Sequence, residues 1–284
     1  MKLELKDLSY VYSPETPYEH AAVTDINLSI GEGEFIGLIG HTGSGKSTLI
    51  RHFNGLLRPT SGQVLIDDKD IFADKATLKA ARFAVGMVFQ YPEYQLFEET
   101  VYQDVAFGPK NMGLDPNEID RRVCESLTMV GLDESVYEKS PFALSGGQKR
   151  RVAIAGVIAM QPKLLVLDEP AAGLDPRGKR EIMTYIKRYA AAGNSVLFIS
   201  HSMSDVARYA KRVLVMNDSR LVMDGSVDEV FGRADELHAM GLTVPQMTEV
   251  FLKLREKGFA LPVDVYTADR AASVLLAYMG GERS

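Results

Sequence analysis

The chain alternates between short apolar runs and longer amphipathic stretches, a pattern that predicts a mixed α/β protein. Three runs, at 35–39, 164–167 and 196–199, are apolar throughout, as is typical of central parallel strands covered on both faces. Glycine turns at 31–33 and 60–62 separate the earlier runs, so we expect an antiparallel sheet near the N-terminus. In all, strand-like runs occur at 3–5, 35–39, 64–67, 85–89, 164–167, 195–199 and 213–216.

The rest of the chain has helical patterns. Between about residues 98 and 143 no strong strand pattern occurs, and Pro116 opens a helical pattern that continues to Val130. After Gly225, a capping box at 226–229 precedes apolar residues at helical spacing, namely Met247, Val250, Phe251 and Leu254. We therefore predict a large domain over 1–228, with a helical subdomain at about 98–160, and a small C-terminal helical domain over 229–284.

Composition narrows the class of protein. The 284 residues are 46% hydrophobic and 25% charged, which suits a globular protein with a sizeable core. Cys124 is the only cysteine, so a disulfide framework is excluded and a reducing compartment is expected. The first residues predict a strand rather than a signal peptide, and no apolar run is long enough to cross a bilayer. The net charge of −6 argues against general nucleic-acid binding.

A glycine-rich loop directly follows the apolar run at 35–39 and is the most informative motif. Glycines let backbone N–H groups converge on a phosphate, and the helix that follows adds its positive N-terminal end. Lys46 is expected to reach the β- and γ-phosphates, and Ser47 to bind Mg²⁺. We therefore expect nucleoside triphosphate to bind at Gly40, His41, Thr42, Gly43, Ser44, Gly45, Lys46, Ser47 and Thr48.

Two further segments have the chemistry of a nucleotide site. The apolar run at 164–167 ends in Asp168, placed to hold Mg²⁺ through water, and Glu169, placed to polarise an attacking water. A second segment precedes an apolar helix and offers glycines and a helix N-terminus to an anion; it comprises Ser145, Gly146, Gly147 and Gln148. Basic residues at 149–151 crowd that N-terminus, which predicts a compensating anion there.

Together these motifs resemble those of the ATP-binding cassette ATPases over about residues 1–228. The resemblance implies an α/β cassette with a RecA-like P-loop core, an antiparallel β subdomain, a helical subdomain and a C-terminal dimerisation domain. It implies that the segment at 144–148 faces the phosphate loop of a second subunit, with two ATP molecules between them. It also implies an adenine-stacking Tyr12, for which Tyr10 is a rival, a Mg²⁺- and water-contacting Gln90, an intersubunit Asp175 and a γ-phosphate-binding His201.

A narrower resemblance lies in residues 89–101, FQYPEYQLFEETV, which is similar to the glutamine-loop segment of energy-coupling factor importers for vitamins and transition-metal ions. Residues 90–97 and 147–151 look most like the second, A-prime, ATPase subunit, and Gly156 resembles the energy-coupling factor group. The resemblance implies ATP and Mg²⁺ as cofactors and a peripheral position at the cytoplasmic face of the cell membrane. It implies as partners a second cassette, a transmembrane T subunit and a substrate-binding S subunit.

The same resemblance implies a surface for coupling to the T subunit, comprising Glu93, Tyr94, Leu96, Phe97 and Glu98. Because acids flank the aromatic residues, we expect an arginine of the T subunit to dock against Glu93, Glu98 or Glu99. An ordinary buried aromatic cluster is the other explanation for Tyr91, Tyr94, Leu96 and Phe97.

Other functions stay open at this point. One is a soluble cassette ATPase of DNA repair or translation, against which the acidic balance and the lack of a coiled-coil insertion argue. Another is a cobalt or nickel importer ATPase, since those proteins share much of the same motif. The solute itself is not encoded here, because its recognition would reside in a separate membrane subunit.

Overall fold

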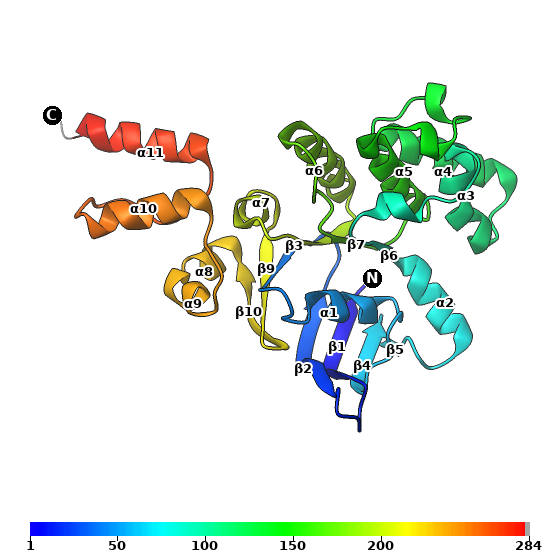
Figure 1. Ribbon diagram of the computed structural model, residues 1–284, viewed down its shortest axis with the longest axis horizontal. Coiled ribbons are helices and arrows are strands. Elements are labelled where there is room, and N and C mark those ends of the chain that lie inside the picture. The colour runs from blue at the N-terminus through cyan, green and yellow to red at the C-terminus, as the bar shows by residue number, and fades with distance from the viewer. Residues whose placement is uncertain (282–284) are drawn as a thin grey trace. The chain divides into compact units, whose positions relative to one another are not determined.

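The computed structural model, drawn in Figure 1, describes residues 1–281. The chain forms two compact units. Unit 1 comprises Met1–Glu34 and Ser47–Ile199. Unit 2 comprises Phe35–Lys46 and the chain from Ser200 onward. The boundary between the units therefore falls between Lys46 and Ser47, inside the glycine-rich loop.

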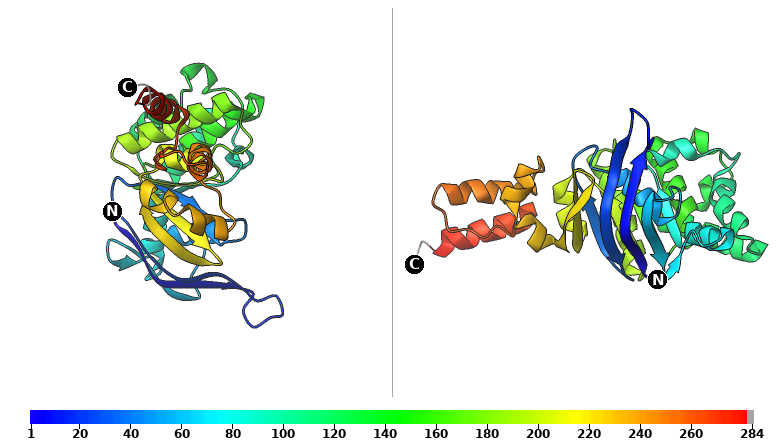
Figure 2. Two further views of the ribbon diagram at one scale, coloured as in Figure 1. Left: turned by 90° about the vertical axis from the view of Figure 1, so that its left-hand side faces the viewer. Right: turned by 90° about the horizontal axis from the view of Figure 1, so that it is seen from below.

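Unit 1 contains the antiparallel sheet that the sequence predicts, in the order β2-β1-β4-β5. Its strands are β1 (Leu3–Tyr12), β2 (His20–Ile30), β4 (Ser61–Ile66) and β5 (Lys69–Asp70), and Figure 2 shows β1 and β2 as a long hairpin. β1 is 10 residues long, far longer than the predicted run at 3–5. Register shifts after Leu5 and a φ of +49° at Asp7 break the apolar alternation, which is why the pattern concealed its length.

Unit 1 also contains three parallel strands, β6 (Val85–Val88), β7 (Leu164–Asp168) and β8 (Ser195–Ile199). β7 lies between the other two, and its first four residues are completely buried. The prediction of central parallel strands at 164–167 and 196–199 is therefore confirmed. Because parallel strands end at the same edge, the segments after β6 and β7 emerge together.

The helical insertion predicted after residue 98 is confirmed. α3 (Val101–Met112), α4 (Pro116–Met129) and α5 (Gly146–Ile158) pack on one another (Figure 1), and a 3₁₀ turn, η1 (Pro92–Gln95), packs against α5. The other helices of this part of the chain are α1 (Lys46–Phe53), α2 (Lys75–Ala84) and α6 (Pro176–Ala191), and two short 3₁₀ turns, η2 (Glu134–Val136) and η3 (Pro141–Ala143), precede α5.

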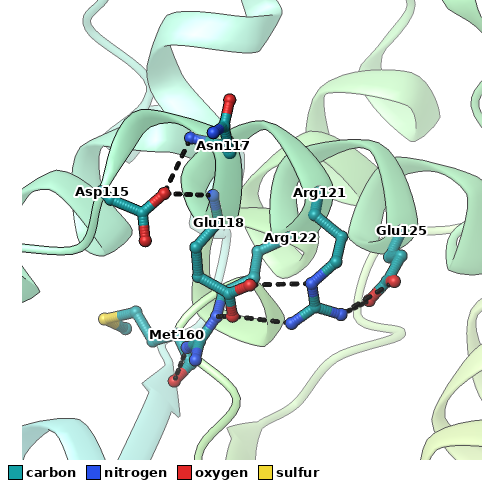
Figure 3. A network of polar contacts seen from close by, with 7 residues as sticks. All are labelled: Asp115, Asn117, Glu118, Arg121, Arg122, Glu125 and Met160. Carbon is teal, nitrogen blue, oxygen red and sulfur yellow. Dashed lines mark hydrogen bonds and ion pairs between the residues drawn. The ribbon is translucent and has the colours of Figure 1, made fainter.

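A charged network ties α4 to the end of α5, as Figure 3 shows. Glu118 accepts hydrogen bonds from Arg121 and Arg122, which lower the pKa of its carboxyl to about 2. Arg122 Nη1 also donates to Met160 O at 3.4 Å, just beyond α5. Asp115 caps the start of α4 by accepting from the backbone of Asn117 and Glu118.

Unit 2 is built on β3 (Phe35–Ile39), which pairs in parallel with β9 (Arg212–Asn217). β10 (Arg220–Ser226) pairs antiparallel to β9. α7 (Met203–Tyr209) lies so close to β3 that a Cβ at Gly37 would be 2.6 Å from Val206 Cγ1. A glycine in the middle of this strand therefore lets the helix approach it.

The end of unit 2 is helical. α8 (Val227–Phe231) and α9 (Ala234–Ala239) are short, whereas α10 (Gln246–Glu256) and α11 (Ala268–Gly281) lie side by side in Figures 1 and 2. Phe251, Leu261, Val265 and Ala271 form a small buried core there. Within residues 1–281, no helix has the length and apolarity needed to cross a bilayer.

His52 is a fully buried histidine on α1, at the base of an aromatic cluster. Its Nδ1 donates to Thr48 O at 2.9 Å, and its ring meets that of Tyr10 edge-on at 5.1 Å. Its Nε2 has no hydrogen-bond partner among residues 1–281. Burial lowers the pKa of His52, although its backbone hydrogen bonds oppose this, so protonation destabilises the fold.

We predict that His52→Leu reduces the loss of stability on acidification. Unfolded histidine binds a proton at pKa about 6.5, so its contribution is fully present above that pH and is lost as pH falls through it. Between pH 8.0 and 6.0 the loss is up to about 0.8 kcal/mol. Urea unfolding at both pH values should show a smaller difference for His52→Leu than for the wild type. The exposed His20→Leu control should keep the wild-type difference; an unchanged difference in His52→Leu would contradict the prediction.

Candidate functional site

In unit 2, the glycine-rich loop closes around the Lys46 side chain. Lys46 Nζ donates to Gly40 O and to His41 O, both at 2.7 Å, and lies 3.4 Å from Ser44 Oγ. Gly40 has a φ of +153°, and a Cβ there would come within 2.3 Å of Met216 O. The loop therefore needs glycine at position 40. The ammonium group of Lys46 is held inside the loop by these carbonyl groups.

In unit 1, Ser47 contacts the acid at the end of β7. Ser47 Oγ donates to Asp168 Oδ2 at 3.0 Å. The two residues are 121 positions apart in the chain. Two motifs that the sequence assigns to one nucleotide site thus meet through this bond.

Gln90 and Glu169 follow neighbouring strands at the same edge. β6 and β7 are paired in parallel up to Val88 and Leu167, so the segments that contain Gln90 and Glu169 leave the sheet together. Gln90 is exposed, and Glu169 is half-buried with a φ of +52°. A left-handed backbone is uncommon for glutamate and requires support from the surrounding structure.

Tyr12 lies beside the start of α1. Its hydroxyl is 3.3 Å from Thr48 Oγ1, and its ring meets Tyr10 edge-on with centroids 4.8 Å apart. Tyr10 is in turn packed against the buried His52. Tyr10, the other candidate for stacking on adenine, therefore lies against the core, whereas Tyr12 contacts Thr48 at the end of the glycine-rich loop.

Ser145 is the N-cap of α5 and forms a capping box with Gln148. Gln148 N donates to Ser145 Oγ at 3.3 Å, and Ser145 N donates to Gln148 Oε1 at 3.0 Å. Apart from their chain neighbours and the nearby backbone of α5 itself, no atom of the described chain lies within 4 Å of a Cβ built on Gly146 or Gly147. The packing of this subunit therefore does not require glycine at these two positions.

Asp175 and His201 lie at the starts of two helices. Asp175 is the exposed N-cap of α6 and accepts a hydrogen bond from Gly178 N at 2.7 Å. It borders a hollow of about 240 Å³ that Ser145, Gly147 and Gln148 also line. His201 is an exposed residue of unit 2, directly before Ser202, the N-cap of α7.

A second candidate site is a mainly apolar groove of about 270 Å³ in the helical part of unit 1. Leu96 and Phe97 of the predicted coupling surface line it, whereas Tyr94 does not and is 85% exposed. Glu98 lies next to the groove, and its N–H donates to Asp104 Oδ2 at 3.1 Å. The remaining lining residues are Phe83, Gln95, Asp104, Phe107, Gly108, Asn111, Val152, Ala153, Gly156, Val157 and Met160.

Glu93 differs from the expectation that it would face an arginine of another subunit. Its two carboxylate oxygens accept hydrogen bonds from Arg150 Nε at 2.9 Å and Arg150 Nη2 at 2.7 Å. Arg150 belongs to α5 of the same chain and is 2% exposed. Glu93 is therefore engaged inside the subunit, since Arg150 supplies its arginine partner.

Asp104 is an acid of the groove that the sequence analysis missed. It accepts backbone hydrogen bonds from Phe97 and Glu98, while burial raises the pKa of its carboxyl. It lies on α3, outside the aromatic segment where acids were sought. In the sequence, Asp104 lies in the first turn of a helix, where an acid is explained by the helix dipole alone. The sequence therefore does not indicate that Asp104 lines a groove.

Comparisons with known proteins agree with this fold and these motifs. The family model described as ABC transporter matches residues 23–172. The energy-coupling factor transporter ATP-binding protein EcfA2 of Clostridium perfringens is 51% identical over 278 residues, covering 97% of this chain and 98% of the relative. EcfA2 of Symbiobacterium thermophilum is 52% identical over 283 residues, covering 100% and 98%.

Solved structures give the same result. CbiO1 of Clostridium perfringens, described as part of the ABC transporter complex CbiONQ, has a TM-score of 0.73 and 41% identity, covering 84% of this chain and 93% of that one. A dimeric ATP-binding cassette bound to ADP and phosphate has a TM-score of 0.70 and 30% identity, covering 79% and 98%. The chain therefore belongs to the ABC transporter family, within the ATP-binding subunits of energy-coupling factor transporters.

Proposed function

We propose that this chain hydrolyses ATP to energise import through an energy-coupling factor complex, as the second of its two ATP-binding subunits. The hydrogen bond between Ser47 and Asp168 carries the proposal, because it joins the phosphate loop to the acid that precedes Glu169. Near-full-length relatives that share about half of its residues and are named as ATP-binding proteins of such transporters support the transport role.

Lys46 and the backbone N–H groups of its loop bind the phosphates of ATP in this proposal. Glu169 is the general base, Gln90 orients the attacking water and His201 stabilises the transferring phosphoryl group. Electrostatic positioning supplies most of the catalysis in phosphoryl transfer, so these charged and polar groups matter more than covalent chemistry. The proposed ATP-binding set is Tyr12, Gly40, His41, Thr42, Gly43, Ser44, Gly45, Lys46, Ser47, Thr48, Ser145, Gly146, Gly147, Gln148 and Asp175.

The oxygen atoms at the end of β7 fit a magnesium ion. Ser47 Oγ and Asp168 Oδ2 are 3.0 Å apart. Adjacent ligands of an octahedral Mg²⁺ shell with bonds of about 2.05 Å are separated by about 2.9 Å. We therefore assign Ser47, Asp168 and Gln90 to Mg²⁺, directly or through water, where the ion would neutralise charge on the phosphates.

A second cassette is the proposed partner of the segment at 144–148. Gly146 and Gly147 have open space where a Cβ would point, so their own subunit does not explain the two glycines. Glycine at a helix N-terminus permits close approach of an anion from another molecule. This supports a pair of cassettes with ATP between them, in which Asp175 lies near the interface.

The groove between α3 and α5 is the proposed docking site for a transmembrane T subunit, in a complex that also contains a substrate-binding S subunit. Its apolar lining suits a short helix, and Asp104 gives it a carboxylate that can pair with an arginine. The coupling surface therefore includes Leu96, Phe97 and Glu98 and extends to Asp104. Through such partners the chain would sit at the cytoplasmic face of the membrane.

The region after residue 228 is proposed to stabilise the pair of cassettes. Of its predicted interface residues, Phe251 is buried in the local core, whereas Val250 is exposed. Leu276 and Met279 on α11 are 71% and 59% exposed. Such large apolar groups on one helix suit a partner surface. The last three residues of this proposed domain, 282–284, lie outside the described part of the chain.

A cobalt or nickel importer ATPase remains the second candidate, because CbiO1 from the complex CbiONQ matches at 41% identity. Purifying the membrane complex and identifying its bound solute tests the second candidate: a vitamin would exclude a cobalt or nickel importer, and bound cobalt or nickel would support it. Pull-down of an integral membrane subunit would exclude a soluble cassette of repair or translation, whose ATPase activity DNA or ribosomes would stimulate.

We predict that Glu169→Gln lowers the turnover of the assembled ATPase about 10²-fold or more, because the amide keeps the shape but cannot accept the proton of the attacking water. ATP affinity should stay within about twofold, since the loss is confined to the transition state. Steady-state phosphate release and nucleotide titration measure the two effects. Glu125→Gln, on the surface of α4, is the matched control, and turnover near wild type in Glu169→Gln would refute the assignment.

We predict that Gly156→Arg blocks docking on the membrane partner. A Cβ at Gly156 would be 3.7 Å from Asp104 O, so the fold tolerates a side chain there, but arginine would occupy the groove. Co-purification with the membrane subunits should fall about tenfold or more, the effect of losing about 1.4 kcal/mol. Nucleotide affinity should not change.

Gly156→Ala is the control for groove filling, because its methyl group makes only ordinary contact. It should assemble like the wild type. Normal assembly and uptake by Gly156→Arg would place the docking surface elsewhere.

We predict that Leu276→Lys combined with Met279→Lys weakens pairing of cassettes by about tenfold or more, because charges would replace apolar contacts at the interface. Both side chains are exposed, so the fold should not change. Sedimentation at low micromolar concentration measures the association. Val222→Lys, an exposed apolar position on β10, is the control; association of the double variant at wild-type strength would remove α11 from the interface.

A further inference from the structure

Arg150 is a buried charge on α5 that contacts two turns of unit 1. It is the fifth residue of α5, the helix that Ser145 caps, and only 2% of it is exposed. Its side chain reaches the turn after Gln90 and the turn after Glu169. Among the largest fully buried side chains of the described residues, Arg150 is the only charged one. Burying a charge is costly, so its partners are informative.

The first set of contacts is with the turn η1. Arg150 Nε and Nη2 donate to the two oxygens of Glu93 at 2.9 and 2.7 Å. Burial is the largest single influence and would raise the pKa of Glu93, but the hydrogen bonds and charge of Arg150, together with a backbone hydrogen bond, lower the pKa on balance, so the pair is ionic. The guanidinium carbon also lies 5.8 Å from the centre of the Tyr91 ring. This arrangement fixes the residues that directly follow Gln90.

The second set of contacts is with the turn after Glu169. Arg150 Nη1 donates to Ala172 O at 2.5 Å and lies 3.4 Å from Pro170 O. The same guanidinium thus binds a carboxylate on one side and backbone carbonyls on the other. A planar fork with five N–H groups can satisfy both at once, whereas an ammonium on a flexible stem cannot.

Both turns have uncommon backbone conformations next to the proposed catalytic residues. Tyr91 has a φ of +54° and Glu169 has a φ of +52°. Non-glycine residues in the left-handed region cost free energy and persist where surrounding contacts hold them. Arg150 contacts the segment that follows each of them. The Tyr91 ring also lies close to Gly173, where a Cβ would be 3.6 Å from Tyr91 Cε1.

We propose that Arg150 is a positioning residue, which holds Gln90 and Glu169 in one arrangement with the helix that begins after Ser145 and thereby raises kcat. The inference rests on the proposed ATPase function of this chain. Because Arg150 contacts the two turns rather than the phosphate loop, it acts on the chemical step and not on ATP affinity.

The test compares Arg150→Lys and Glu93→Gln with the wild type in the assembled ATPase. Each variant keeps a polar side chain of similar size but loses part of the two-sided bond. We expect kcat to fall about tenfold and the dissociation constant for ATP to stay within about twofold, the signature of an interaction that matters only in the transition state. Tighter or weaker binding by tenfold with unchanged kcat would overturn the inference.

A double variant shows whether the two residues act together. If Arg150 works through Glu93, then Arg150→Lys with Glu93→Gln should be no slower than the slower single variant, within about twofold. Multiplied losses in the double variant would mean that the two side chains act independently, which would overturn the proposed link. Glu93→Gln retains the arginine, so it tests the link even where Arg150→Lys folds poorly.

Arg122→Lys is the matched control (Figure 3). Arg122 likewise bonds a glutamate, Glu118, and a backbone carbonyl, that of Met160, but it contacts neither turn. It should keep the wild-type kcat once rates are corrected for the nucleotide-binding fraction. An equal fall in kcat for Arg122→Lys would show that the effect is general loss of packing and would overturn the positioning role.

The failure of this inference differs from failure of the proposed function. If wild type and Glu169→Gln hydrolyse ATP at the same rate, the proposed function is wrong. If Glu169→Gln is slow as expected while Arg150→Lys keeps the wild-type kcat, only the positioning role is wrong.

Discussion

Strand β7 is the constraint on which the site in unit 1 depends. Its residues Leu164–Leu167 have no exposed surface, and β6 and β8 bind it on its two sides. Because β7 is paired on both edges and buried on both faces, a slip by one residue would break both ladders and exchange its side chains between two differently packed faces. Asp168 therefore ends the strand at a fixed height, where Ser47 reaches it. Hydrophobic burial in this strand thus sets the position of a charged group at its end.

The sequence predicts the segments whose pattern is local. The buried strands, the glycine-rich loop and the capped helix after Ser145 each have a signal within a few residues, and the structure contains all of them. β1 was underestimated because bulges interrupt its alternation. β2 was missed, although its second half alternates, with Ile26, Leu28 and Ile30 buried. The bond between Ser47 and Asp168 joins residues 121 positions apart, and the sequence indicated that they act together only because both motifs have the chemistry of a Mg²⁺ site.

One residue of the predicted coupling surface, Glu93, differs from its expectation for a physical reason. Charged residues near aromatic ones suggest an exposed docking site, but Glu93 turns toward Arg150, 57 residues later. Only the packing of η1 against α5 creates that pair, and sequence spacing does not encode it. Conversely, Asp104 enters the groove because α3 packs on α5 through two close glycines, Gly108 and Gly156. Contacts between residues far apart in the sequence thus decide that Glu93 pairs with Arg150 and that Asp104 lines the groove.

Helix α5 connects the two candidate sites through its own rigidity. Four residues of α5 line the groove, namely Val152, Ala153, Gly156 and Val157. Arg150, half a turn before Val152, binds the turns that follow Gln90 and Glu169. A buried ion pair contributes little to stability relative to apolar residues of similar volume, because desolvation offsets its attraction. Its geometry, however, is directional: the guanidinium satisfies Glu93 and the carbonyl of Ala172 only in one placement of the two turns. A displacement of α5 by a partner in the groove would have to move those turns or break their bonds. The buried charge therefore provides a specific mechanical connection where an apolar contact would allow the helix to slide.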